Sequence, residues 1–257
     1  MISTSRLKNI LALKQKKIRA QRKLFLIEGH RLCQEAIQSN FIVETLLVNP
    51  EILSPQKFNE IIQIARTQQL EIIEIAKAEV NQLADTINSQ GIFCIVQQKK
   101  YDLEIILNKQ NKLIVIINEG QDPGNVGTVI RTCDWFGIDA VLLSKGTAEL
   151  FNPKVVRSTM GSIFHLPIVE QVDVNVLLPR LKKLGYHIFG ADVNGEYAYH
   201  QIDYAIPMVL VIANENHGFE NDLYCYLDKT VKIPSYGQAE SLNMSVAAAI
   251  IISQMVN

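Results

Sequence analysis

The sequence predicts an α/β protein in two parts, the larger of which holds a parallel sheet covered by helices on both faces. Short, continuously apolar segments such as residues 113–118 and 208–214 alternate with helical patterns, as strands buried in parallel sheets do. Hydrophobic residues make up 48% of the 257 residues and charged residues 20%, the balance of a folded globular protein. A polar segment at 99–112 separates two α/β patterns, which places the domains at 1–107 and 108–257.

The first part is expected to be a small α/β unit that ends near residue 100. Residues 1–22 carry apolar side chains at roughly helical spacing among basic ones. Ser54 before Pro55 predicts a helix start, because serine caps helices and proline suits the first helical position. The expected strands are 23–29, 43–49, 70–75 and 91–98, and the expected later helices are 30–39 and 54–69.

The second part repeats this alternation after the polar segment. A Gly-rich loop and a helix follow its first apolar strand. The expected strands are 113–118, 140–144, 187–193, 208–214 and 230–234, and the helix after the loop covers 126–137. Because ligand sites in open α/β sheets lie at the carboxyl ends of strands, the loops that follow these strands are the places to look for chemistry.

Charge is distributed unevenly along the chain, although the net charge is −1. Residues 1–27 hold eight basic side chains and no acid: Arg6, Lys8, Lys14, Lys16, Lys17, Arg19, Arg22 and Lys23. A basic arm on an otherwise acidic protein points to a polyanion such as nucleic acid. A solvated helix face would give the same cluster. An organelle presequence is a weaker alternative, because the segment is poor in serine.

Several classes of protein are excluded by composition. The four cysteines are far apart and form no CxxC pair, which argues against a zinc ribbon or a disulfide framework and favours a reducing cytosol. No apolar run has the length of a membrane span. Neither HExxH nor a Cys/His cluster is present, so no metal is expected. We therefore expect a cytoplasmic protein that acts without a membrane.

The first loop with candidate chemistry lies in residues 118–137. It is neither the GxGxxG fingerprint nor a Walker A loop, since its glycines are differently spaced and no Lys-Ser/Thr follows. Asn125 is suited to cap the helix, and Arg131 falls inside it among apolar residues. Arg131 has two interpretations: a structural ion pair with Glu119 or Asp134, or a clamp on a phosphate or ribose.

Two further loops carry polar residues after apolar strands. In residues 211–220, Glu215 follows a fully apolar strand and precedes Gly218, so its carboxylate would be partly desolvated. In residues 233–252, Ser241, Asn243 and Ser245 occupy alternate positions at the start of a helix. One cap needs one residue, so three of them raise the question of a ligand.

These loops match a known family. The spacing Asn125-x-Gly127-x3-Arg131, then NENHG after a strand, then IPSYGQAESLNMSVA, together resemble the three motifs of the SpoU (TrmH-like) family of RNA ribose 2′-O-methyltransferases, in the SPOUT superfamily. Residues 157–168 look like the segment that links the family's motifs. The resemblance covers about residues 112–257. Residues 5–96 resemble the family's N-terminal RNA-binding domain, which is similar to L30e-type folds.

The resemblance implies a deep trefoil knot in the C-terminal domain, S-adenosylmethionine as cofactor and a homodimer. It implies an active-site set of Asn125, Arg131, Glu215, Ser241 and Asn243. Cofactor contacts are expected at Ala213, Asn214, Gly218, Ile233, Gly237, Leu242 and Ser245, where Ala213 replaces the family's usual glycine. We expect RNA contacts from the eight basic residues of the N-terminal arm and from Arg157.

The reaction expected is methyl transfer to a ribose 2′-hydroxyl, which needs alignment of donor and acceptor and no metal. Alignment can contribute about 7–11 kcal/mol. Because a guanidinium stays protonated, we expect Arg131 to fix the neighbouring phosphate and ribose, while the proton passes to a phosphate oxygen or water. Asn125, Ser241 and Asn243 would orient ribose and cofactor, and Glu215 would hold Arg131 or a segment of the dimer partner.

Three functions compete for this sequence. An RNA 2′-O-methyltransferase is the leading one, and a separate N-terminal domain favours ribosomal RNA over transfer RNA. A catalytically silent RNA-binding module of the same fold is the alternative, against which the intact polar set counts. A nucleotide-dependent oxidoreductase is disfavoured, because GxGxxG and its acidic ribose ligand are missing.

Overall fold

The computed structural model describes residues 2–108, 113–214 and 218–257. The chain divides into two compact units. Unit 1 comprises residues up to 99 together with 151–165, and unit 2 comprises 100–150 and 166–257. The segment 151–165 thus leaves its sequence neighbours and folds with the N-terminal residues.

Unit 1 is built on a mixed sheet with strand order β1-β4-β2-β3. The strands are β1 (Leu24–Glu28), β2 (Val43–Val48), β3 (Glu71–Glu74) and β4 (Ile92–Gln97). Strand β4 runs antiparallel to β1 and β2, and β3 runs parallel to β2. All four strands fall within predicted segments. The helices are α1 (Thr4–Leu11), η1 (Ala12–Lys14), α2 (Lys16–Arg22), α3 (His30–Gln38), α4 (Pro55–Thr67), α5 (Lys77–Leu83), α8 (Pro153–Thr159) and η2 (Ser162–Phe164).

Two features of unit 1 refine the sequence predictions. The helix expected over residues 1–22 is divided into α1 and α2 by the 3-10 turn η1. Helix α4 begins at Pro55 after Ser54, as predicted, although the Ser54 side chain makes no capping hydrogen bond. Helix α5 was not anticipated.

The segment 151–165 is held on unit 1 by aromatic rings. The ring centroids of Phe25 and Phe151 are 4.8 Å apart, and Phe164 packs against Phe41 edge to face at 5.0 Å. Such contacts stabilise beyond the area they bury. Gly161, in the same segment, packs closely against Glu35: a Cβ at residue 161 would lie 2.8 Å from the Cγ of Glu35, and the φ of Gly161 is +110°. The packing therefore requires glycine at residue 161.

Unit 2 contains an all-parallel sheet with strand order β7-β6-β5-β10-β8-β11-β9. This confirms the predicted parallel sheet. The strands are β5 (Leu113–Ile117), β6 (Ala140–Ser144), β7 (Ile168–Val172), β8 (His187–Ala191), β9 (Tyr197–Ala198), β10 (Met208–Ile212) and β11 (Lys229–Lys232). The helices are α6 (Leu103–Leu107), α7 (Pro123–Trp135), α9 (Val174–Lys183), η3 (Tyr199–Gln201), α10 (Asn221–Tyr224) and α11 (Met244–Met255). Strands β7 and β9 had not been expected.

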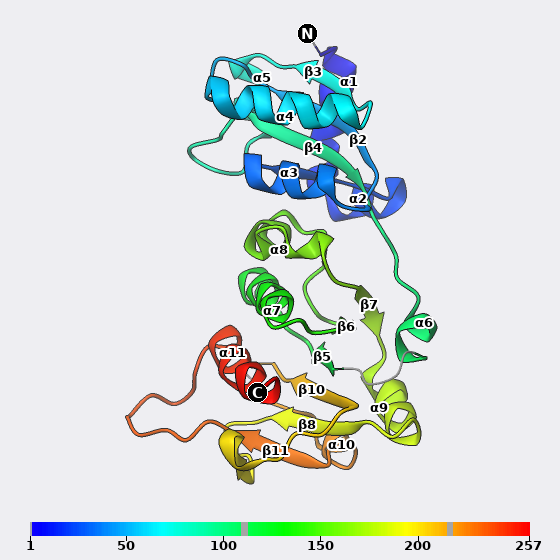
Figure 1. Ribbon diagram of the computed structural model, residues 1–257, viewed down its shortest axis with the longest axis vertical. Coiled ribbons are helices and arrows are strands. Elements are labelled where there is room, and N and C mark those ends of the chain that lie inside the picture. The colour runs from blue at the N-terminus through cyan, green and yellow to red at the C-terminus, as the bar shows by residue number, and fades with distance from the viewer. Residues whose placement is uncertain (1, 109–112, 215–217) are drawn as a thin grey trace. The chain divides into compact units, whose positions relative to one another are not determined.

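Helices cover both faces of this sheet. On one face, buried residues of α6, α9 and α10 form one apolar cluster with residues of β5, β6, β8 and β10. On the other face α7 contacts β6 and α11 contacts β8, and α7 and α11 pack against each other (Figure 1). The polar segment expected to be a boundary holds α6, whose Ile106 and Leu107 are buried in the unit 2 core.

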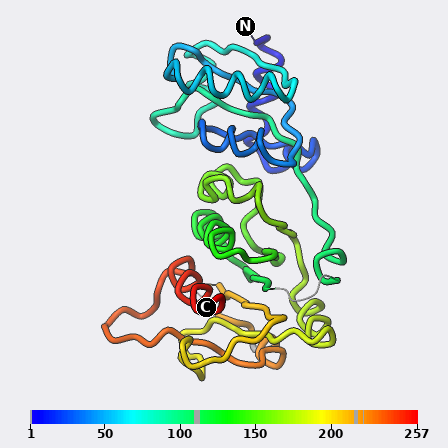
Figure 2. Tube along the Cα trace, viewed as in Figure 1, coloured from blue at the N-terminus to red at the C-terminus, as the bar shows by residue number. Residues whose placement is uncertain are grey.

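The chain reaches α11 by a long excursion. After β11, residues 233–243 run out from the sheet and return to the start of α11, beside α7 (Figure 2). Strand β11 lies on the far side of β8 and β10 from β5. The last helix is thereby carried back to the elements that begin the unit.

We expect Phe164→Ala to lower the stability of unit 1 by about 3 kcal/mol, because it removes a buried ring from the cluster that holds residues 151–165. Hydrogen–deuterium exchange of peptides from β1 and β4 reports on this unit separately. Met160→Ala is the matched control: Met160 lies in the same segment, is 38% exposed, and should cost less than about 1 kcal/mol. Equal costs for the two variants would contradict the role given to the rings.

Candidate active site

The first two candidate loops meet because their strands are neighbours. Strands β5 and β10 pair in parallel, and the Asn118 amide continues the pairing by donating to the Ile212 carbonyl at 2.8 Å. Beyond it, the buried Asn214 side chain donates from Nδ2 to the Glu119 carbonyl at 2.9 Å. Asn214 also forms an antiparallel bridge with Gly218. The two loops are therefore joined at the sheet edge where parallel strands end.

A buried polar network fixes the start of the first loop. Glu119 has a left-handed backbone with φ +53°, and its amide donates to the Ser144 hydroxyl at 2.8 Å. Thr147 donates to the Ile117 carbonyl at 3.1 Å. Ser144 and Thr147 are both buried, so their bonds replace the water that the loop backbone would otherwise need. Sequence reasoning missed both residues, although a hydroxyl that closes the apolar run AVLL was a signal.

The cap of α7 is Asp122, which corrects the prediction for Asn125. The Asp122 carboxylate accepts a hydrogen bond from the Asn125 amide at 2.9 Å, and Pro123 occupies the first turn. Aspartate caps well because its oxygen reaches the third N–H of the helix. The Asn125 side chain is consequently free of the capping role, and its Oδ1 accepts a bond from another loop.

That bond joins the first loop to the third. The Asn243 Nδ2 donates to the Asn125 Oδ1 at 3.0 Å, across 118 positions of sequence. Asn243 is also the cap of α11, since its Oδ1 accepts from the Ser245 amide at 2.9 Å and from the Ser245 hydroxyl at 2.6 Å. One side chain thus starts a helix and ties it to α7. Ser241 is exposed and makes no hydrogen bond to any residue the structure describes.

Side chains of Ile117, Val126 and Met244 also pack around Gly120. A Cβ at this position would lie 2.7 Å from the Ile117 side chain and 3.4 Å from the Met244 Cε. Met244 is the first residue of α11. The glycine is therefore required by the side chains of Ile117 and Val126 (3.1 Å), while Met244 at the start of α11 packs beside it at an ordinary contact distance.

Arg131 lies on α7 with its side chain exposed. Among the described residues it forms no hydrogen bond or ion pair, and the structural alternative of a pair with Glu119 or Asp134 is not found there. Arg131 therefore presents a guanidinium to solvent from a helix whose first turn is joined to Asn243. The clamping role predicted for it stays a prediction.

The predicted cofactor residues lie along the second and third loops. Ala213 is half-buried against the unit 2 core, and Asn214 makes the loop contact described above. Ile233 is partly buried, whereas Gly237 and Leu242 are exposed. A Cβ at Gly237 would meet no atom within 4 Å. Glu215, the remaining member of the predicted polar set, lies outside the described residues.

The basic arm divides into two groups of side chains. Arg6 forms a two-pronged ion pair with Glu71, and this hydrogen bonding lowers the pKa of the Glu71 carboxyl. Lys14 pairs with Asp85 at 2.9 Å, and Arg22 bonds the backbone and side chain of Asn9. Arg19 is only 3% exposed and donates to the carbonyls of Leu13 and Lys14, which leaves it nothing to offer an RNA phosphate.

The other group consists of exposed lysines. Within the described parts of the chain, the ammonium groups of Lys8, Lys16, Lys17 and Lys23 make no hydrogen bond or ion pair. These four remain open to an outside ligand.

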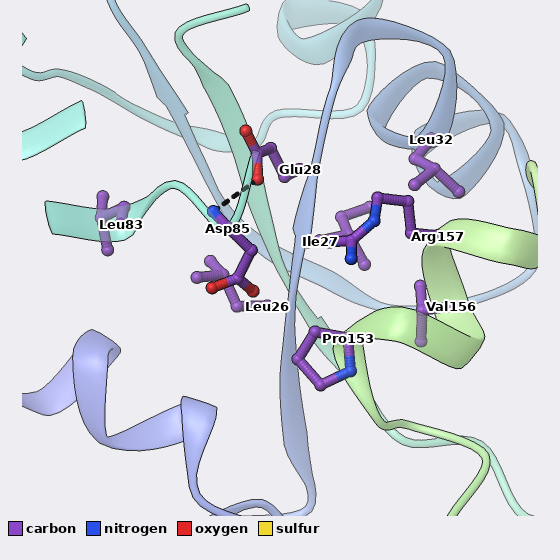
Figure 3. A pocket seen from close by; sticks show the side chains of 9 residues that line it. All are labelled: Leu26, Ile27, Glu28, Leu32, Leu83, Asp85, Pro153, Val156 and Arg157. Carbon is purple, nitrogen blue, oxygen red and sulfur yellow. Dashed lines mark hydrogen bonds between the residues drawn. The ribbon is translucent and has the colours of Figure 1, made fainter. Parts of the chain in front are cut away.

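Arg157 borders a small cavity inside unit 1 (Figure 3). The cavity has a volume of about 20 Å³, which is room for a single water. Glu28 lies on the same cavity, but its carboxylate accepts bonds from the Asp85 amide and the Thr86 hydroxyl. Arg157 is half-buried and has no ion-pair partner among the residues described.

Neither a metal-binding cluster nor a membrane-spanning helix is found in the described parts of the chain. No group of three or more His, Cys, Asp or Glu side chains that could hold a metal ion occurs among them. Likewise, no helix in the described ranges is long and apolar enough to cross a bilayer.

An all-parallel sheet whose neighbouring loops are joined at the carboxyl ends of β5 and β10, with the C-terminal helix bonded to α7, has the arrangement of an α/β enzyme site. The family model for SpoU rRNA methylases matches residues 112–253, and the model for the MRM3-like substrate binding domain matches residues 4–94. The chain therefore belongs to the SpoU rRNA methylase family.

Individual relatives agree with this assignment. The 23S rRNA (guanosine(2553)-2′-O)-methyltransferase RlmP of Bacillus subtilis is 34% identical, over 92% of this chain and 90% of the relative. The SpoU methyltransferase AviRb of Streptomyces viridochromogenes, solved with AdoMet, superimposes with a TM-score of 0.88 at 27% identity, covering 99% of this chain and 97% of its own. An AdoMet-bound rRNA methyltransferase from Sinorhizobium meliloti gives 0.85 at 26% identity, with 99% and 96% covered.

We expect Asn243→Ala to loosen the first turn of α11 by about 1–2 kcal/mol, because it removes both the cap and the bond to Asn125. Faster amide exchange at the start of α11 would measure this. Ser241→Ala is the matched control, since Ser241 has no bond to lose within the described chain. If the two variants exchanged alike, Asn243 would not be the residue that anchors this helix.

Proposed function

We propose that this protein transfers a methyl group from S-adenosylmethionine to a ribose 2′-hydroxyl of ribosomal RNA. The observation that carries the proposal is the joining of Asn125 to Asn243, which ties the third loop to the first turn of the helix that carries Arg131. The family membership supplies the reaction class. The B. subtilis relative acts on guanosine 2553 of 23S rRNA, so 23S rRNA is the first substrate to test. A cytosolic location follows from this substrate.

The second and third loops suit the cofactor. The segment 234–243 offers exposed backbone, an open position at Gly237 and apolar side chains at Tyr236 (96% exposed) and Leu242 (46%). An adenosine with a thioether tail would cover such apolar surface and bond to free backbone groups. Ala213, Asn214, Gly218, Ile233, Gly237, Leu242 and Ser245 would hold it. When bound, S-adenosylmethionine supplies an electrophilic methyl group on a positively charged sulfur.

The protein's own residues would align the target nucleotide and neutralise the charge of its phosphate. Arg131 would hold the phosphate and ribose of the target nucleotide through its planar fork, and the proton of the 2′-hydroxyl would pass to a phosphate oxygen or water. Asn125 and Asn243 would orient the ribose, with each amide fixed by the other. Ser241, which is exposed and unbonded within the described chain, would turn toward the substrate. Glu215 would hold Arg131 or a segment of the second subunit.

The N-terminal unit would bring the RNA to this site. Its match to a substrate-binding domain supports that role. The proposed domains are 1–107 and 108–257, with residues 100–107 folding as part of the C-terminal unit and residues 151–165 as part of the N-terminal unit. The silent RNA-binding module is the competing function. Measuring S-adenosylmethionine binding by calorimetry separates the two, since only the enzyme needs the cofactor.

We expect Arg131→Lys to slow methyl transfer to 23S rRNA at least about 100-fold, because a point charge cannot replace a two-pronged contact. Affinity for S-adenosylmethionine should change little. The measurement is incorporation of labelled methyl groups, followed by mapping of 2′-O-methylation. Arg180→Lys is the matched control: Arg180 lies on α9 and pairs with Glu104, away from the three loops. A near-normal rate for Arg131→Lys would overturn this role.

The proposal includes the family's homodimer and trefoil knot. Apolar side chains are exposed at Trp135 (84%) on α7, at Val246 (47%) on α11 and at Val256 (41%), the residue that follows α11. Large exposed apolar groups on packed helices favour association. The segment that returns the chain from β11 to α7 would form the trefoil knot.

We expect light scattering to give twice the 28.9 kDa mass of the chain, and Val246→Asp to shift the protein toward monomer, because a charge on α11 would be buried in the dimer. Lys229→Asp, a charge change on β11, is the control. A wild-type protein that stays monomeric at micromolar concentration would remove the dimer from the proposal.

A further inference from the structure

The two units carry opposite charge. Unit 1 has fifteen Lys and Arg residues against nine Asp and Glu, a net charge of +6; unit 2 has ten against seventeen, a net charge of −7. The segment 151–165 adds two cations and no anion to unit 1. A field of this sign attracts polyanions to unit 1 and repels them from most of unit 2.

Internal partners narrow the choice of cations within unit 1. Arg6, Lys14 and Arg19 are engaged with Glu71, Asp85 and backbone carbonyls, respectively. Helix α2 contributes the exposed Lys16 and Lys17 and its C-cap contributes the exposed Lys23; their ammonium groups have no partner among the described residues. On its buried side, α2 presents Arg19 and the partly buried Ile18, so the lysines occupy the solvent side.

A fourth lysine joins them from the other end of the unit. The Gln98 amide donates to the Lys23 carbonyl at 2.7 Å, and the Gln98 side chain donates to the Arg19 carbonyl at 3.3 Å. These bonds place Lys99 next to the end of α2. The Lys99 ammonium donates to Asn40 at 2.7 Å and lies over the Phe41 ring at 5.6 Å, which holds it in place. We name Lys16, Lys17, Lys23 and Lys99 the α2 lysine surface.

We propose that the α2 lysine surface binds the phosphate backbone of the RNA substrate. The inference rests on the proposed function and deepens it by naming where the substrate-binding unit holds RNA. Lysines are compact point charges, suited to phosphates and carrying no base readout. Phe41, the ring beside Lys99, is 8% exposed and cannot stack on a base. Binding here is therefore independent of sequence and positions the RNA.

Other polyanions fit the surface less well. A membrane-binding helix needs apolar side chains to insert into the bilayer, and residues 16–23 contain only Ile18 and Ala20 as apolar residues, with Ile18 packed against the unit 1 core. An acidic protein partner would require apolar contacts as well as charge. Sequence-independent binding to an RNA phosphate backbone needs charge alone.

The test compares two triple variants with the same loss of charge from unit 1. Lys16→Gln/Lys17→Gln/Lys23→Gln removes three members of the surface. Lys57→Gln/Arg66→Gln/Lys77→Gln removes three exposed cations from α4 and α5. Binding to a uridine homopolymer and to 23S rRNA is measured between about 50 and 200 mM salt. Thermal unfolding confirms that both variants fold, as expected for side chains without internal partners.

We expect the first triple variant to lose at least about tenfold in affinity for both RNAs and to flatten the slope of log K against log salt by about 2, because each lysine releases counterions from one phosphate. The second variant should keep the wild-type slope. Equal losses in the two variants would show a general field rather than a surface and would overturn the proposal. So would an unchanged slope in the first variant, or binding of the wild type to phosphatidylserine vesicles in preference to RNA.

Failure of the proposed function would give a different result. If the wild type binds RNA with a steep salt slope that depends on the α2 lysine surface but transfers no methyl group, the surface stands and the enzyme assignment falls. If methyl transfer occurs and the first triple variant binds RNA as the wild type does, the reverse holds.

Discussion

The parallel pairing of β5 with β10 is the constraint on which the candidate site depends. It sets Asn118 beside Ile212, and from there the Asn214 amide reaches the Glu119 carbonyl across loops that are 95 positions apart. Parallel strands deliver their following loops to one edge of a sheet, so a single register decides which loops can meet. The third loop arrives by a different route, through the bond from Asn243 to Asn125 and the packing of Met244 beside Gly120.

Much of the fold could be predicted from the sequence because its signals are local. Segments such as residues 113–117 and 208–212 are apolar at every position, which suits a strand only if both faces of its sheet are covered. In the structure every residue of these two strands is buried. The motifs of the site were also readable, because they combine residue type with spacing. The sequence predicts Asn125 as the cap of α7, whereas the cap is Asp122. Both residue types can cap a helix, one before and one after Pro123, and only the backbone conformation shows at which of them the helix begins.

The rest depends on contacts between distant residues. Ser144 and Thr147 acquire their role from backbone groups of the neighbouring strand, which no local pattern reveals. The basic arm shows the same limit: its eight cations look alike in sequence, yet Arg19 is buried on carbonyls whereas Lys16 and Lys17 face solvent. Charge in a sequence predicts a partner for the segment, and only the fold distinguishes the side chains that can reach it.

The placement of residues 151–165 has a consequence for how members of this family can diversify. The peptide chain passes from one unit to the other after residues 99, 150 and 165. A recombination event that exchanged only the first hundred residues would leave behind Phe151 and Phe164, rings that complete the hydrophobic interior of the exchanged part. Replacement of the N-terminal unit therefore requires residues 151–165 to be replaced with it, so the two parts of the sequence are expected to change together.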